Sequence, residues 1–229
     1  LDHTQFLGDT LDKIAFEKAG IIKPNTAVVI GETTTETKPV FEQIAADRKS
    51  EIIFAENKFF QDVESDLKGT YQIKNKRTVL TAIEQLQKQG WNINSENITK
   101  GLLNVVKNTN LRGRWDVLAH NPLIVADTAH NPHGLSEVSK QINEQPYNQL
   151  HLVLGFVNDK DVLSILNFFP KKATYYFCQP DVPRKYNIDE LYKIIPDDIS
   201  DKHFFDTTEK ALIAAKLNAS ADDMIYIGG

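Results

Sequence analysis

The stretch Leu123-Ile124-Val125-Ala126-Asp127-Thr128-Ala129-His130-Asn131-Pro132 contains the unit from which the second half of this chain is built. Its four apolar residues predict a short buried strand, and the polar residues after them predict a turn at the carboxyl end of that strand. Asn131 followed by Pro132 is typical of a helix N-cap and the first helical position. A strand that leads through a short turn into a helix is the repeating element of a parallel sheet.

The same alternation continues to the end of the chain. Further strands are predicted at 150–154, 174–177 and 224–227, and helices at 132–142, 160–168, 188–194 and 208–217. Short links between these elements predict an α/β fold in which helices cover both faces of a parallel sheet. Polar residues follow each predicted strand, at 127–134, 155–161, 179–184 and 228–229. Because parallel sheets bind ligands beyond the carboxyl ends of their strands, this rim is the first place to expect a site.

The first half of the chain has a different pattern. A helix that ends at Gly20 is predicted first, then strands at 27–30 and 52–54 and helices at 38–48 and 75–89, with Gly90 stopping the last of these. Ser95 is predicted to cap another helix, and 57–69 is predicted to be irregular. The polar residues near 107–110 have no apolar periodicity and suggest a linker. The predicted domains are therefore 1–107 and 111–229, joined by a hinge at 108–110.

Composition excludes some classes of protein. The chain has 229 residues, of which 41% are hydrophobic and 25% charged, as in ordinary globular proteins. No apolar run reaches the roughly 18 residues that a membrane span needs. The net charge of −5 argues against a nucleic-acid partner. Cys178 is the single cysteine, so an intramolecular disulfide and a cysteine-rich zinc site are excluded, and a cytoplasmic location is expected.

Two residues near the start of the chain could support metal chemistry. His3 could be a metal ligand, a general base or a plain polar residue. Mg²⁺ would suit it as a ligand, because this ion needs few protein ligands. Lys18 lies in the last turn of the first predicted helix, where the charge of a surface lysine interacts favourably with the helix dipole. A lysine with a lowered pKa can instead act as a nucleophile or form a carbamate with carbon dioxide. Spacing alone leaves both alternatives open.

Two residues of the second half could contact a nucleotide. Arg114 could bind a phosphate, stack on an adenine or form a salt bridge at a domain interface. Asp127 ends an apolar strand, where a carboxylate can accept ribose hydroxyls or cap a helix. Neither GxxxxGK[ST] nor GxGxxG occurs in the sequence, so the chain by itself is not expected to hold a triphosphate.

Five segments together resemble one family. The opening LDHTxxLGDTxxxIAxEKAGIIK stretch is a specific match, and four shorter segments follow in the same order: 69–75, 112–114, 127–132 and 159–161. They resemble the folylpolyglutamate synthases and bifunctional dihydrofolate synthases of the Mur ligase superfamily. The resemblance covers essentially the whole chain.

The resemblance implies a role for several residues. His3 corresponds to a magnesium ligand, and Lys18 to a carbamylated lysine that supports a second metal ion. Asn75, Arg114 and Asp127 correspond to nucleotide contacts, and His130 to a catalytic residue on the glutamate side of the cleft.

The resemblance also implies an architecture and an activity. The chain would comprise the tail of a central P-loop-type ATPase domain, followed by a Rossmann-like C-terminal domain with a mostly parallel sheet. The enzyme would use ATP and Mg²⁺ to add L-glutamate to a pteroate or folate, as a monomer. The family's phosphate loop and most pterin-binding residues would precede Leu1, so we expect the chain alone to be inactive. The alternatives are a UDP-muramoyl amino-acid ligase and a non-catalytic nucleotide-binding domain.

Overall fold

The computed structural model describes residues 8–229, which form two compact units. Unit 1 runs to Asp66 and again from Thr70 to Asn110, whereas unit 2 comprises Leu67–Gly69 and Leu111–Gly229. The residues predicted as a hinge, 108–110, lie at the end of helix α6 (Val105–Thr109) and at its C-cap, Asn110, which has a φ of 56°. Their action as a hinge stays a prediction.

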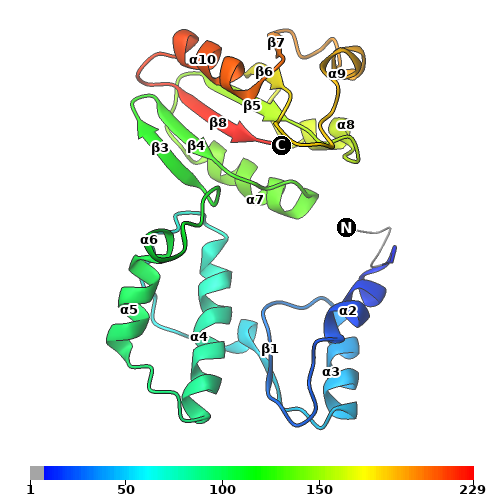
Figure 1. Cartoon of the computed structure of the whole chain (residues 1–229), viewed down its shortest axis with the longest axis vertical. Coiled ribbons are helices and arrows are strands. Elements are labelled where there is room, and N and C mark those ends of the chain that lie inside the picture. Colours follow the sequence, from blue (N-terminus) through cyan, green and yellow to red (C-terminus); the bar gives the residue numbers. More distant parts are fainter. Residues whose placement is uncertain (1–7) are drawn as a thin grey trace. The chain divides into compact units, whose positions relative to one another are not determined.

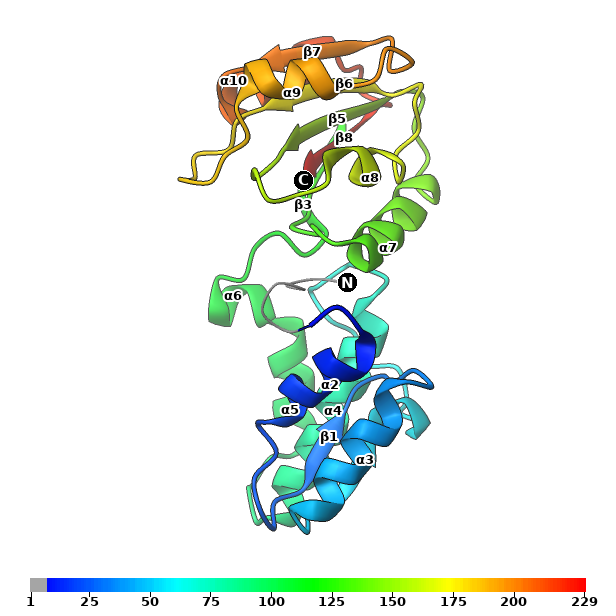
Figure 2. The same cartoon turned by 90° about the vertical axis from the view of Figure 1, so that its right-hand side faces the viewer.

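Unit 1 is built around a two-stranded parallel sheet, in which β1 (Val28–Ile30) pairs with β2 (Ile52–Phe54). Helix α2 (Leu11–Ala19) packs against α3 (Thr37–Asp47), and α4 (Gln72–Lys88) contacts β1 and the short 3-10 helix η1 (Ala55–Asn57) (Figure 2). Helix α5 (Ser95–Leu103) precedes α6. The strands and helices predicted for this half are therefore present, and residues 58–69 are irregular as expected.

Two predicted boundaries in unit 1 were wrong. Helix α4 begins at Gln72 rather than at Asn75, after an N-cap residue, Tyr71, whose side chain makes no capping hydrogen bond. Helix α5 is capped by Asn94 rather than by Ser95. The Asn94 side chain accepts a hydrogen bond from the backbone N–H of Asn97 at 2.8 Å, and Asn97 returns one to the backbone of Asn94. This reciprocal pair satisfies two N–H groups at once, which Ser95 cannot do from one position later.

Unit 2 contains a six-stranded sheet in the order β3-β4-β8-β5-β6-β7 (Figure 1). Strand β3 is antiparallel to β4, and every other neighbouring pair is parallel. The predicted α/β fold with a mostly parallel sheet is confirmed. The strands are β3 (Asp116–His120), β4 (Leu123–Ala126), β5 (Leu150–Gly155), β6 (Thr174–Cys178), β7 (Lys202–Phe205) and β8 (Met224–Gly228).

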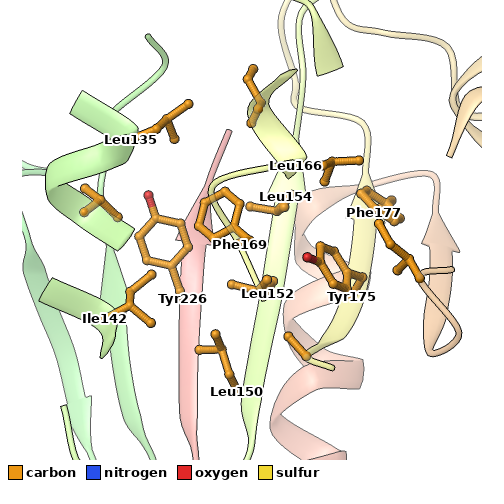
Figure 3. Packing of buried hydrophobic residues seen from close by; sticks show 14 of the residues in the cluster. Leu135, Ile142, Leu150, Leu152, Leu154, Leu166, Phe169, Tyr175, Phe177 and Tyr226 are labelled. Carbon is orange, nitrogen blue, oxygen red and sulfur yellow. The ribbon is translucent and has the colours of Figure 1, made fainter. Parts of the chain in front are cut away.

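The two faces of this sheet are covered by different helices, because side chains alternate between the faces along each strand. On one face, Leu152, Tyr226 and their neighbours pack with residues of α7, α8 and α9 (Figure 3). On the other face, Val153 and Ile225 pack against Ala211 of α10. Figure 1 shows α7 and α10 on opposite sides of β8. The helices are α7 (Pro132–Asn143), α8 (Val162–Leu166), α9 (Ile188–Ile194) and α10 (Thr208–Asn218).

The order of the strands places the polar segments where a site was expected. Strands β4, β8, β5 and β6 are consecutive neighbours and run parallel, so their carboxyl ends lie along one edge of the sheet. The polar segments at these strand ends therefore lie along the same carboxyl edge; they are residues 127–134, 155–161, 179–184 and 228–229. The opposite, amino edge receives the segments that lead into the same strands.

A short piece of chain from far upstream completes unit 2. Residues 67–69 belong to it, although the residues before and after them belong to unit 1. The backbone oxygen of Lys68 accepts a hydrogen bond from Nε2 of Gln141 at 3.0 Å. Gln141 lies in α7 and is 4% exposed, so this contact is made at a buried position.

Candidate functional site

Asp127 organises the carboxyl edge at the end of β4. It is 4% exposed, and each carboxylate oxygen accepts one backbone N–H: Oδ2 from Trp115 at 2.7 Å and Oδ1 from Ala129 at 2.8 Å. The carboxylate thus joins the segment that leads into β3 to the turn that leaves β4.

Gly113 and Thr128 hold these same two segments in direct contact. The backbone N–H and the Oγ1 hydroxyl of Thr128 donate to the carbonyl oxygen of Gly113 at 3.0 and 3.1 Å. Gly113 has a φ of +69°, and a Cβ atom at this position would lie 2.6 Å from Cγ2 of Thr128. Both the backbone conformation and the close approach therefore require glycine.

Arg114 is anchored by this contact. Its Nη1 donates to the carbonyl oxygen of Gly113 at 3.1 Å and to the hydroxyl of Thr128. Both acceptors are neutral oxygens, so the guanidinium charge is left for an anion. Arg112 is used differently, because its Nε donates to Oδ2 of Asp116 at 2.6 Å. Of the two arginines, Arg114 is therefore the better candidate for a phosphate contact.

His130 and the start of α7 lie directly after Thr128. Nδ1 of His130, whose side chain is exposed, lies 2.9 Å from the backbone oxygen of Thr128. Asn131 caps α7 by accepting the N–H of Gly134 at 2.9 Å, and Pro132 takes the first turn, both as predicted. The helix N-terminus adds a partial positive charge to this part of the edge.

Two other carboxylates of the carboxyl edge have partners within the protein. Nη1 of Arg184 lies 3.1 Å from Oδ1 of Asp159. Asp161 caps α8 through the N–H of Ser164 at 3.2 Å and also accepts its hydroxyl at 2.6 Å. The predicted rim therefore contains carboxylates with structural partners, and Arg114, which lies beside it, is held by neutral oxygens.

The predicted site residues fall into two groups. Unit 2 brings Arg114, Asp127 and His130 together within one local arrangement of β3, β4 and α7. Asn75 lies in the first turns of α4 in unit 1, where its Nδ2 donates to Oε1 of Gln72 at 2.9 Å. Lys18 is exposed in the last turn of α2. His3 lies outside the described residues.

Thr128 was not predicted to have a role. The sequence shows a hydroxyl between Asp127 and His130, but its contacts with Gly113 and Arg114 depend on the pairing of β3 with β4.

The described residues include groups suited to a nucleotide but no cluster of side chains suited to a metal ion. A guanidinium, a carboxylate and a helix N-terminus suit the phosphate and ribose of a nucleotide. For a metal ion, no group of three His, Cys, Asp or Glu residues converges within residues 8–229. Of the two residues expected to hold magnesium, the structure describes only Lys18.

A family profile decides the relationship of the chain. The profile described as "Mur ligase, glutamate ligase domain" matches residues 113–229, which is more than half of the sequence and begins at the Gly113–Thr128 contact. The chain belongs to the Mur ligase family. The antiparallel β3, the parallel strands and the Asp127 arrangement all lie within the matched domain.

Related proteins match beyond that domain. The dihydrofolate synthase/folylpolyglutamate synthase of Escherichia coli K12 is 25% identical over 242 aligned positions, which cover 100% of this chain and 55% of the relative. The chain spans about half the length of the curated relatives that match it from end to end.

Solved structures of Mur ligases share the fold. Mycobacterium tuberculosis folylpolyglutamate synthase, complexed with ADP and AMPPCP, has a TM-score of 0.84 at 20% identity, covering 100% of this chain and 59% of the other. A bifunctional folylpolyglutamate synthase/dihydrofolate synthase with Mn, AMPPNP and L-glutamate bound has a TM-score of 0.80 at 22% identity, covering 100% and 56%. None of the helices within residues 8–229 is long and apolar enough to cross a membrane.

Proposed function

We propose that this chain is part of an ATP-dependent ligase that joins L-glutamate to dihydropteroate, to folate polyglutamates, or to both. The observation that carries the proposal is the match of residues 113–229 to the glutamate ligase domain. It is supported by the folate ligases that align with the whole chain. The first unit would then be the tail of the ATPase domain. The complete enzyme would use Mg²⁺ and act as a cytoplasmic monomer without nucleic-acid or membrane partners.

The chemistry of amide formation explains why ATP is required. A carboxylate reacts poorly with an amine, because it has no good leaving group. Transfer of the γ-phosphoryl group of ATP to the pteroate or folate carboxylate gives an acyl phosphate, which the amine of L-glutamate attacks. The products are the amide, ADP and phosphate. Protein groups contribute by positioning the reactants and by neutralising phosphate charge.

Residues of unit 2 would bind and orient the nucleotide. The Arg114 guanidinium would neutralise phosphate charge, and Thr128 would hold it in position through its hydroxyl. The Asp127 carboxylate would accept hydrogen bonds from the ribose hydroxyls. His130, exposed at the start of α7, would lie on the glutamate side.

The roles proposed in unit 1 complete the assignment. Asn75 would contact the nucleotide. Lys18, in carbamylated form, and His3 would be ligands of the magnesium ions, which would supply further neutralisation of phosphate charge.

The test is a substrate panel with the complete enzyme. Phosphate release from ATP should require both L-glutamate and either dihydropteroate or a folate. Turnover with UDP-muramoyl precursors in place of the pterin substrates would assign the enzyme to peptidoglycan synthesis instead. Nucleotide binding by calorimetry without turnover of either substrate class would indicate a non-catalytic binding domain and would overturn the proposal.

A further inference from the structure

Trp115 has a backbone conformation that a residue of its size rarely adopts. Its φ is +52°, in the left-handed region, where the Cβ atom of any residue other than glycine crowds the backbone. Among the described residues, the other non-glycine residues with a positive φ are Asn25, Lys49 and Asn110, and all three are exposed. Trp115 is 4% exposed. A strained conformation at a buried residue persists only where the surrounding structure enforces it.

Two interactions enforce the conformation of Trp115. Its indole belongs to the same cluster of buried side chains as Val125 of β4 and Leu135 of α7, so it cannot leave this position without exposing a large apolar surface. Its backbone N–H donates to Oδ2 of Asp127 at 2.7 Å. Rotation out of the left-handed region would move either the indole or this N–H group away from its partners. The strain at Trp115 is therefore offset by burial and by a hydrogen bond.

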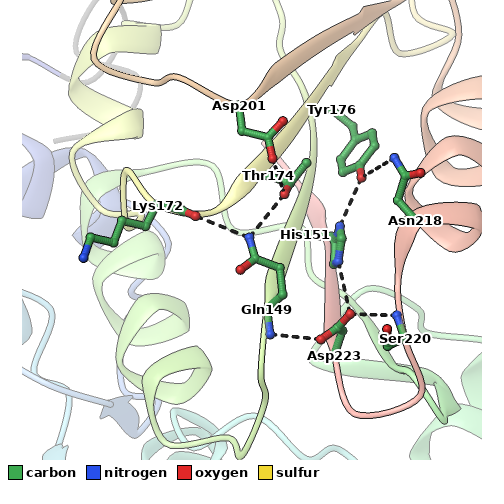
Figure 4. A network of polar contacts seen from close by, with 9 residues as sticks. All are labelled: Gln149, His151, Lys172, Thr174, Tyr176, Asp201, Asn218, Ser220 and Asp223. Atoms are coloured by element: carbon green, nitrogen blue, oxygen red, sulfur yellow. Dashed lines mark hydrogen bonds and ion pairs between the residues drawn. The ribbon is translucent and has the colours of Figure 1, made fainter.

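A buried carboxylate that binds two backbone N–H groups does not by itself produce a left-handed residue. At the amino edge of the same sheet, Asp223 accepts the N–H groups of Gln149 at 3.0 Å and Ser220 at 2.7 Å (Figure 4). Neither Gln149 nor Ser220 has a positive φ. The conformation of Trp115 is therefore not a general consequence of contact with a buried aspartate, and it calls for a reason in its own segment.

Arg114 lies between two buried left-handed residues, Gly113 with a φ of +69° and Trp115. The backbone N–H of Gly113 donates to Oδ2 of Asp116 at 3.3 Å, and its carbonyl oxygen accepts the N–H of Thr128 at 3.0 Å. Arg114 itself is partly exposed. Because the residues on both sides are held in place, the backbone sets the direction in which the Arg114 side chain leaves it. In that direction Nη1 reaches the oxygens of Gly113 and Thr128.

We propose that Trp115 is a positioning residue, whose buried indole maintains the left-handed backbone that directs the Arg114 guanidinium to the phosphates of the nucleotide. This inference rests on the nucleotide contact proposed above for Arg114. Trp115 is buried and acts through the backbone of residue 114, not by contact with the nucleotide. An arginine that is already oriented loses less conformational freedom when a phosphate binds, so the arrangement strengthens nucleotide binding.

Substitutions at Trp115 separate the role of the indole from that of the backbone. Trp115→Phe keeps an aromatic side chain in the core. Trp115→Ala and Trp115→Gly both remove it, but only glycine adopts a positive φ without strain. The left-handed backbone should therefore persist in Trp115→Gly and be lost in Trp115→Ala. Phe169→Ala is the control, because Phe169 is also 4% exposed and belongs to the same buried cluster but is far from Arg114 in the sequence.

The orientation of Arg114 is measured in the ¹⁵N-labelled 229-residue chain through its guanidinium Nε–H resonance, assigned with Arg114→Lys. We expect this resonance to keep its position in Trp115→Phe, Trp115→Gly and Phe169→Ala, and to move to that of an unconstrained arginine in Trp115→Ala. If truncation to alanine unfolds the chain, Trp115→Leu takes its place, with a smaller displacement expected. An unmoved resonance in the folded variant, or an equal displacement in Phe169→Ala, would disprove the role of Trp115.

Kinetics of the complete enzyme test the consequence for the nucleotide. KM for ATP should rise about threefold to tenfold in Trp115→Ala, where burial no longer offsets the left-handed backbone, with a lesser change in kcat. It should rise less than about twofold in Trp115→Gly. A purely structural role predicts that these variants and Phe169→Ala lose stability but keep KM unchanged. A displaced Arg114 resonance with an unchanged KM would leave Trp115 as the residue that orients Arg114 and would contradict the nucleotide contact in the proposed function.

Discussion

The two edges of the unit 2 sheet use an aspartate in the same way but surround it with different chemistry. Asp127 at the carboxyl edge and Asp223 at the amino edge are 4% and 7% exposed, and each accepts two backbone N–H groups from separate segments. The neighbour of Asp127 is the Arg114 arrangement at the start of a helix. The neighbour of Asp223 is His151, whose Nε2 lies 3.5 Å from Oδ2 of Asp223, near the end of a helix.

This comparison separates what an aspartate does for the fold from what it does for a ligand. Either carboxylate fixes two loops, so a buried aspartate alone does not indicate a binding site. The sign of the charge around the aspartate indicates which kind of ligand could bind there. The arginine and the helix N-terminus near Asp127 suit an anion.

The largest effect should come from Arg114→Ala in the complete enzyme. Hydrogen bonds from a charged group contribute about 1.5–3 kcal/mol, so kcat/KM for ATP should fall by about tenfold to a hundredfold. Steady-state kinetics with varied ATP measures this, with Arg48→Ala in unit 1 as the matched control, because Arg48 is exposed at the end of α3. Equal kinetics in the two variants would remove Arg114 from the nucleotide site.

Replacing each aspartate by asparagine tests their shared structural role. Asparagine has an NH₂ group in place of one carboxylate oxygen. One of the two backbone N–H groups would then face another donor instead of an acceptor. We therefore expect Asp127→Asn and Asp223→Asn each to lower the free energy of unfolding by about 1–3 kcal/mol, as measured by urea denaturation.

The same pair of variants also separates the two edges functionally. Only Asp127→Asn should weaken ATP use beyond its effect on stability, when activity is assayed well below the unfolding transition. A comparable loss of ATP use in Asp223→Asn would contradict the assignment of the nucleotide to the carboxyl edge.

A smaller effect is expected at Thr128, which positions Arg114. Thr128→Val keeps the shape and removes the hydroxyl, so KM for ATP should rise about twofold to tenfold with a lesser change in kcat. Thr128→Ser keeps the hydroxyl and should restore most of the affinity. If Arg114→Ala weakens ATP use but Thr128→Val does not, the guanidinium is held without this hydroxyl.

The smallest effect should appear in acid, at Asp223. Burial raises the pKa of the Asp223 carboxyl. The backbone N–H groups of Ser220 and Gln149, together with His151, lower it by more, so that the net pKa lies below the usual 3.8. The carboxylate therefore contributes stability above that usual value, which is lost as pH falls through the lowered pKa.

Urea denaturation between about pH 5 and pH 2 measures this contribution. Asp223→Asn should have a shallower loss of stability with falling pH than the unsubstituted chain. Parallel curves for the two proteins would show that the charged form of Asp223 is stabilised no more in the folded state than in the unfolded state.

Strands buried on both faces could be predicted from the sequence, whereas the edge strands could not. The run Leu123-Ile124-Val125-Ala126 is continuously apolar because helices cover both of its faces. Strand β3 (Asp116–His120) and strand β7 (Lys202–Phe205) lie at the two sides of the sheet and carry exposed polar residues, so neither has a periodic pattern that marks a strand. Both were missed for this reason.

The two edges also differ in how far their residues could be predicted. Asp127, His130 and Asn131 are adjacent in sequence and stand at a predicted strand end, so one motif identifies them. His151, Tyr176, Asp201 and Asp223 come from four different segments and meet only because β5, β6 and β8 are neighbours. No spacing in the sequence encodes that neighbourhood. This group of residues at the amino edge could therefore be found only in the folded chain.

The three residues 67–69 affect the order in which the chain can fold. Unit 2 needs a tripeptide that precedes the rest of its sequence by more than forty residues, all of which belong to unit 1. The Lys68–Gln141 hydrogen bond closes a loop of 73 residues, which raises the entropic cost of completing unit 2. Residues 111–229 expressed alone would lack this acceptor for Gln141. A fragment that begins at Leu111 therefore lacks part of unit 2. To express unit 2 separately, residues 67–69 should be fused to residues 111–229.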